Sequence, residues 1–134
     1  MEGVSAPGAR ASAHLLEHRE TIARAVGEAL YGEMPWLLDK YGERGRQKCL
    51  QDMRYNLEHL IPAVELQAPD MFARYAAWAA GVLRARGVPT AELARSMEIM
   101  RADVAVRLPQ DQAGAVAECL DAGIAALRGA REAA

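Results

Sequence analysis

The most regular pattern in the sequence lies in residues 46–66, which read RQKCLQDMRYNLEHLIPAVEL. Apolar side chains recur in this stretch at intervals of three and four residues, as they do on one face of an α-helix. Pro62 lies inside the run, and because proline has no backbone N–H it should kink or shorten the helix. The stretch predicts a long amphipathic helix whose buried face carries Leu50, Met53, Leu57, Leu60, Ile61 and Val64.

Similar patterns continue on both sides of this helix. Ser12 and Thr90 belong to the residue types that cap helix N-termini, while Pro35, Gly87 and Pro109 are typical of helix ends. The sequence predicts helices over residues 12–31, 46–66, 69–86, 90–108 and 111–129, with a short apolar turn or helix at 36–38. Their inward positions are expected to include Leu15, Ile22, Val26, Ala29, Leu30, Phe72, Tyr75, Ala79, Val82, Leu83, Leu93, Met97, Met100, Val104, Leu108, Val116, Leu120, Ile124 and Leu127.

The composition agrees with a helical fold. Among 134 residues there are 28 alanines, but Val, Ile and Thr together number only 14. Alanine is the best helix former and β-branched residues favour strands, so we expect an all-α protein. Five or six helices with short, proline-marked turns suit a globin-like or a bundle fold, and periodicity does not choose between them. We expect residues 1–10 to form a flexible arm and residues 11–134 to form one helical domain.

Several function classes find no support in the sequence. The net charge of −2 gives no reason to expect nucleic-acid binding. No apolar run approaches the roughly 18 residues that cross a membrane, and the N-terminus has no apolar signal segment. Two cysteines favour a reduced, cytoplasmic protein. With no phosphate-binding glycine loop, no nucleophile elbow and no third ligand for a metal at His14 and His18, we expect neither an enzyme nor a metal site.

The polar side of the 46–66 helix is a candidate binding surface. Tyr41, Lys48, Asp52 and His59 cluster away from the apolar face, with Tyr55 near them, and Cys49 lies between the two sides. Because Cys49 and Asp52 are three residues apart, both side chains can touch one ligand along the helix. The alternative is an ordinary solvated face with a half-buried thiol.

Three motifs carry a resemblance to a known family. They are Tyr41-x-x-Arg44-x-x-x-x-Cys49-Leu50-x-Asp52-x-x-Tyr55, then Leu83-x-x-x-Gly87-Val88-Pro89, then Ser96 to Arg101 with Ile99 and Met100. In this order and spacing, the segment from Tyr41 to Leu108 resembles the phycobiliproteins, the bilin-binding globins of light-harvesting antennae. The resemblance covers half of the chain.

The resemblance implies a globin-like fold that holds a linear tetrapyrrole, such as biliverdin or a phycobilin, in place of haem. Cys49 matches the cysteine that forms a thioether with ring A, although binding could also be non-covalent. Asp52 matches the aspartate that accepts hydrogen bonds from the inner pyrrole N–H groups. The propionates would meet Lys48, Arg46 and Arg44. The side chains expected to pack on the rings are Tyr55, Phe72, Tyr75 and Trp78, although core packing explains the last three equally well.

Three departures from the family pattern bear on the function. Gln51 stands where the family usually has a propionate-binding arginine. We also expect the chain to lack the full N-terminal antenna extension, and residues 65–70 form a slightly shorter connection. The chain therefore looks more like the bilin-associated globins of non-photosynthetic bacteria, with a role as carrier, sensor or pigment protein. The alternative is a cofactor-free, globin-like sensor or regulatory module that acts through helical dimerisation, and either function allows a homodimer.

Overall fold

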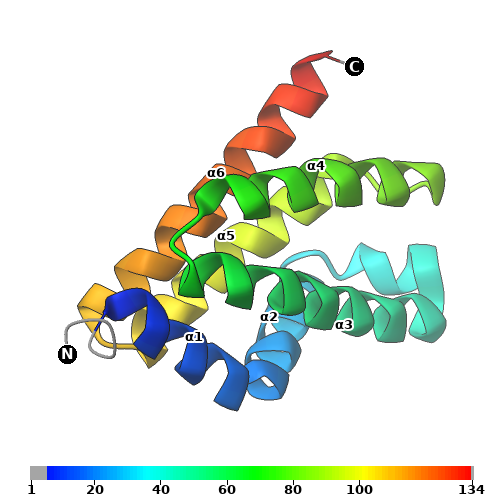
Figure 1. Ribbon diagram of the computed structural model, residues 1–134. Helices are drawn as coiled ribbons and strands as arrows, with labels where there is room; N and C mark the ends of the chain where they lie inside the picture. Colours follow the sequence, from blue (N-terminus) through cyan, green and yellow to red (C-terminus); the bar gives the residue numbers. More distant parts are fainter. Residues whose placement is uncertain (1–5, 134) are drawn as a thin grey trace.

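The computed structural model describes residues 6–133 of the protein, and the side chains of residues 6–129. Within residues 6–133 there are six helices and no strand. Figure 1 shows how the helices are arranged. The prediction of an all-α protein with five to six helices is therefore confirmed. The helices are α1 (Pro7–Glu17), α2 (Arg19–Glu33), α3 (Trp36–Glu65), α4 (Pro69–Ala85), α5 (Thr90–Arg107) and α6 (Gln110–Ala133).

The core lies where α4, α5 and α6 pack together and where α1 and α2 cover α3. Most of the positions expected to face inward do so, including Met53, Leu57, Leu60 and Val64 on α3. Ala29 and Val82 were wrongly predicted to be buried, and both are exposed. Each lies at the edge of its helix's apolar face, where the neighbouring helix does not cover it.

The predicted helix over residues 12–31 is wrong, because the chain forms two helices there. The break falls at His18, whose backbone leaves the helical region with φ −106° and ψ 14°. Ser12 is not a cap: it lies inside α1, where its hydroxyl donates to the carbonyl of Ala9 at 2.9 Å. The break lets Leu15 and Ile22 both reach the core from helices that run in different directions.

Helix α1 begins earlier than the sequence suggested. Pro7 occupies its first turn, where the missing N–H of proline costs nothing because no helical partner exists for it. Residues 7–10, expected to belong to the flexible arm, are therefore helical. Residues 1–5 of that arm lie outside the described part of the chain.

Helix α3 contains a sharp bend near its start. Gly42 has φ +72° and ψ −175°, so the segment Trp36–Tyr41 turns back toward the rest of the helix. Figure 1 shows this segment in cyan, folded over at the free end of α3. The left-handed φ explains why glycine stands there, since other residues rarely adopt it. At the other end, Pro62 lies in the last turn and α3 ends soon after, at Glu65.

The connection between α4 and α5 follows the sequence pattern with one exception. Gly87, with φ +81°, follows the C-cap residue of α4, and Pro89 flanks the start of α5, as expected. Thr90, predicted to be a cap, is instead the first residue of α5, and no side chain caps this terminus. The turn matters for the site because it places the last turn of α4 beside the middle of α3.

Candidate functional site

A cavity of about 710 Å³ lies between α3 and α4, within the usual range of about 300–1,000 Å³ for small-molecule sites. Its further walls come from α2, from the folded-back start of α3 and from the beginning of α5. Polar, aromatic and aliphatic side chains all contribute to its lining. The residues that line it are Leu30, Tyr31, Leu37, Tyr41, Arg44, Gly45, Lys48, Cys49, Asp52, Met53, Tyr55, Asn56, His59, Tyr75, Trp78, Ala79, Val82, Leu83, Arg86, Val88, Glu92, Leu93 and Ser96.

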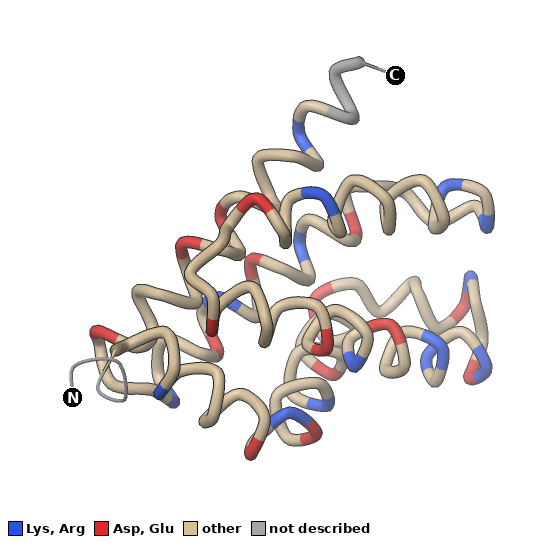
Figure 2. Tube along the Cα trace, viewed as in Figure 1, with Lys and Arg blue, Asp and Glu red and all other residues tan. Residues whose placement is uncertain are grey.

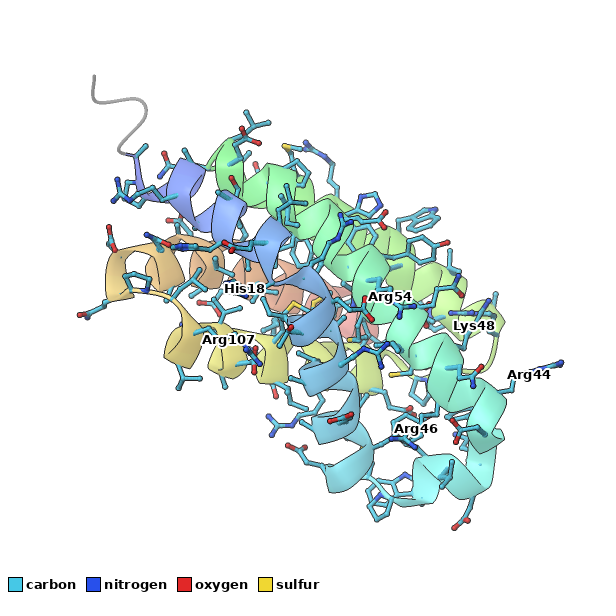
Figure 3. The ribbon with its side chains drawn as sticks, turned by 90° about the horizontal axis from the view of Figure 1, so that it is seen from below. His18, Arg44, Arg46, Lys48, Arg54 and Arg107 are labelled. Carbon is cyan, nitrogen blue, oxygen red and sulfur yellow. The ribbon has the colours of Figure 1, made fainter. Side chains whose placement is uncertain are left out.

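Helix α3 presents most of the predicted site residues to this cavity. Arg44, Lys48 and Asp52 lie four residues apart and therefore share one side of the helix. Arg46 does not line the cavity; it makes an ion pair with Glu43 at 3.8 Å. Figure 3 shows Arg44 and Lys48 projecting from one side of α3, while Arg46 points toward α2.

Asp52 pairs with a cation that the sequence reasoning did not select. The guanidinium of Arg86, from the end of α4, donates to Oδ2 of Asp52 at 3.2 Å. The Asp52 side chain is only 24% exposed, and burial raises the pKa of its carboxyl above the ordinary value, while Arg86 and Lys48 act in the opposite direction. Figure 2 shows cationic positions, in blue, at the adjoining ends of α3 and α4.

Cys49 lies half-buried beside Asp52. Burial raises the pKa of its thiol to about 11, and the negative charges of Asp52 and Glu92 add to the shift. At neutral pH the side chain is therefore a neutral thiol, which is a weak nucleophile compared with a thiolate. The second cysteine, Cys119, is packed in the hydrophobic core.

An aromatic wall formed by α4 faces α3. The Tyr75 hydroxyl donates to Oδ1 of the buried Asn56 at 2.5 Å, and its ring stacks on His59 with centroids 4.1 Å apart. Trp78 stands next to Tyr75 and is 64% exposed, so it lies at the mouth of the cavity. Phe72, also considered for this wall, is fully buried in the core and does not line the cavity.

The opposite end of the cavity holds Tyr31, Tyr41 and Glu92. Burial raises the pKa of Tyr31 to about 12, and it also raises the pKa of the Glu92 carboxyl, which the ammonium of Lys40 opposes. The Tyr41 hydroxyl is buried and has no hydrogen-bond partner among residues 6–129. The Lys40 ammonium lies over the Tyr41 ring, 5.0 Å from its centroid.

Three residues that line the cavity were not selected as ligand contacts from the sequence. Tyr31, Arg86 and Glu92 come from α2, α4 and α5, and no local spacing relates them to Cys49. Only Tyr41 carried a signal, because it belongs to the motif that contains Cys49 and Asp52.

Two further findings limit the kinds of site present. In the described part of the chain, no group of three His, Cys, Asp or Glu residues is placed to hold a metal ion. None of the described helices combines the length and the apolar character needed to cross a membrane. Asp52 and Lys48 both line the cavity, so the surface proposed for ligand binding is not flat.

A family model described as phycobilisome protein matches residues 5–127, which is most of the chain. No curated protein matches the sequence.

Proposed function

The chain belongs to the phycobilisome protein family, whose members are globin-like, all-α and bind bilin pigments, and from this premise we propose that it binds a linear tetrapyrrole between α3 and α4. Members of the family are pigment-binding proteins and not enzymes, and they assemble into oligomers. For this chain, a homodimer stays a prediction that light scattering of the purified protein would test.

One observation carries the proposal: a single cavity joins a thiol, a carboxylate, cations and an aromatic wall. An open-chain tetrapyrrole offers inner N–H donors, two propionates and flat rings, so each of its features finds a matching group. Cys49 and Asp52 come from one face of α3, while Tyr75 and Arg86 come from α4. The residues present therefore fit the group that the family carries.

Asp52 is proposed to accept hydrogen bonds from the pyrrole nitrogens. Its Oδ2 already accepts from Arg86, which leaves Oδ1 for a ligand. In a partly buried site, the negative charge would favour the protonated, cationic pigment by Coulomb attraction. Arg86 would keep the carboxylate ionised and hold it in place.

The remaining groups would hold the propionates and the rings. Lys48 and Arg44 project on the cavity side of α3 and would pair with propionate oxygens (Figure 3). Arg46 has no part in this arrangement because it points toward α2. Tyr75, Trp78 and Tyr55 would pack against the pigment rings, with the exposed Trp78 covering the edge.

Cys49 is proposed to form a thioether when the bilin carries a reactive ring-A side chain. The thiol would add across the exocyclic double bond: sulfur forms the new C–S bond and the proton goes to the neighbouring carbon, without an oxidant. Because burial raises the pKa of Cys49 to about 11, attack at neutral pH would be slow. We therefore propose that biliverdin, whose vinyl group is less reactive than an ethylidene, binds without a covalent bond.

The test is a visible absorption spectrum of purified protein mixed with biliverdin. Binding predicts a red-shifted, sharpened band, which the Asp52→Ala variant should shift or quench. Zinc-induced fluorescence on a denaturing gel reports covalent pigment. A bilin with a ring-A ethylidene group should give this signal with the wild type and not with Cys49→Ala, while biliverdin supplied by co-expression with a haem oxygenase should give none. A spectrum unchanged by the protein would contradict the proposal and favour the cofactor-free regulatory module.

A further inference from the structure

The Tyr41 hydroxyl is an exception among the polar groups of the cavity. Asp52 is paired with Arg86, and Tyr75 is bonded to Asn56. The Tyr41 hydroxyl is the one buried side-chain nitrogen or oxygen without a hydrogen-bond partner in the part of the chain whose side chains are described. Tyr41 lines the cavity, and a buried hydroxyl without a partner is costly, so a ligand atom at this wall that accepts from the hydroxyl would relieve that cost.

Two glycines hold Tyr41 in this position. The left-handed backbone at Gly42 turns the Trp36–Tyr41 segment back over the following helical turn. Gly45 then leaves room beneath the tyrosine, because a Cβ added there would collide with the Cβ of Tyr41. The position of the ring is thus built into the local backbone and does not depend on a side-chain partner for the hydroxyl.

The neighbours of Tyr41 supply hydrogen-bond acceptors close to Cys49. The Tyr31 hydroxyl lies against Gly45, 3.8 Å from the position of an added Cβ. The Glu92 carboxylate lines the same end of the cavity from α5. Gly45 lies four residues before Cys49, about 6 Å along the helix axis. The charge of Glu92 is close enough to the Cys49 thiol to raise its pKa.

We propose that Tyr41 and Glu92 form a subsite for the lactam of the pigment ring that reaches Cys49, an inference that rests on the proposed bilin binding. A lactam has one acceptor, its carbonyl, and one donor, its N–H. Tyr41 donates to the carbonyl and the Glu92 carboxylate accepts from the N–H. This pairing satisfies the hydroxyl and orients the terminal ring with its side chain toward the Cys49 sulfur.

The test compares Tyr41→Phe with the wild type, using biliverdin and biliverdin dimethyl ester as probes. The variant removes one hydroxyl, so both probes should bind about 2- to 10-fold more weakly, the range for a single hydrogen bond. The ester lacks free propionates but keeps its lactams. A loss seen with biliverdin and absent with the ester would show that Tyr41 contacts a propionate, and would overturn the inference.

A second pair of variants tests the acceptor. Glu92→Ala should weaken the binding of both probes, whereas Glu65→Ala, an exposed site at the end of α3 outside the cavity, should leave it unchanged. Equal affinities of the wild type, Tyr41→Phe and Glu92→Ala would overturn the subsite and leave the proposed function standing. If the wild type binds neither probe, the proposed function fails and the inference falls with it.

The melting temperature without pigment separates a ligand contact from a structural role. Because its hydroxyl has no partner in the protein, Tyr41→Phe should melt at the same temperature as the wild type or higher. A fall of more than roughly 5 °C would show that the hydroxyl stabilises the fold, and would overturn the inference.

Discussion

Two opposing effects act on the pKa of Asp52, and the effect of Arg86 can be removed by substitution. Burial raises the pKa of the carboxyl, and the guanidinium 3.2 Å away lowers it. Arg86→Gln should therefore raise the pKa of Asp52 further, seen as a carboxyl ¹³C titration midpoint at higher pH. Because the folded-state pKa lies above the unfolded one, ionisation of Asp52 costs stability as pH rises through that range, and the cost grows in the variant.

The control for this titration is Arg84→Gln, because Arg84 lies one half-turn away on α4 and outside the cavity. It should leave the Asp52 midpoint in place. The free energy of unfolding should change by only about 0–1 kcal/mol in Arg86→Gln, as expected for a partly exposed ion pair. An unchanged midpoint in Arg86→Gln would mean that the pair does not persist in solution.

Cys49 should react slowly with alkylating agents at neutral pH. With a pKa of about 11, about one thiol in ten thousand is ionised at pH 7, and the thiolate is the reactive form. The rate of iodoacetamide labelling should rise about tenfold for each pH unit between 7 and 10. Peptide mass spectrometry separates Cys49 from the buried Cys119, and a rate that levels off below pH 9 would contradict the expected burial.

At the residue scale, helical spacing was informative and long-range pairing was not. Lys48, Cys49 and Asp52 line the cavity as their spacing suggested. The same helical spacing places Arg46 about 200° around the helix from Lys48, so the two side chains do not share one side of α3. Arg86 is different: it sits in another helix, and only the tertiary fold brings it to Asp52. Whether these residues hold pigment stays a prediction until a spectrum is measured.

At the element scale, the close contact of α4 with α6 depends on one glycine. A Cβ on Gly123 would lie 2.7 Å from two ring carbons of Phe72, which is fully buried. Gly123→Ala should therefore lower the free energy of unfolding by about 1–3 kcal/mol through overpacking, measured by urea denaturation.

Gly114, on the same helix, is the matched control for that substitution. No atom lies within 4 Å of a Cβ added there. Gly114→Ala should raise the free energy of unfolding by about 0.5–1 kcal/mol, because alanine is the better helix former. Similar effects of the two substitutions would show that the helices do not pack as closely as described.

Helix boundaries were predictable where glycine or proline marks them. Gly87 and Pro89 separate α4 from α5, and Pro69 opens α4. The break at His18 has no such mark, because neither neighbour disfavours a helix, and the turn arises from packing α1 and α2 on different parts of the core. Local propensity could not reveal it.

For the whole molecule, ligand binding should appear as added stability. A ligand that binds only the folded state at a free concentration 100 times its dissociation constant adds about 2.7 kcal/mol to the free energy of unfolding. Biliverdin at that concentration, taken from the spectroscopic titration, should raise the melting temperature by several degrees. A band shift without any thermal shift would indicate that the pigment does not prefer the folded protein.

The helical class of the molecule followed from composition and periodicity, while the globin-like arrangement required the family motifs. The amphipathic pattern predicts which side of each helix is buried, but it does not predict which helices pack against each other. The motifs around Cys49 and Gly87 supplied that missing information, and the family match over residues 5–127 agrees with it. That residues 11–134 act as one folding unit stays a prediction.

The bend at Gly42 has a consequence for the shape of the cavity. The wall that carries Leu37 and Tyr41 is attached to the rest of α3 through one left-handed residue. A residue without a free left-handed torsion at this position would shift the Trp36–Tyr41 segment relative to the rest of α3. The shape of the cavity therefore depends on one backbone angle as well as on the side chains that line it.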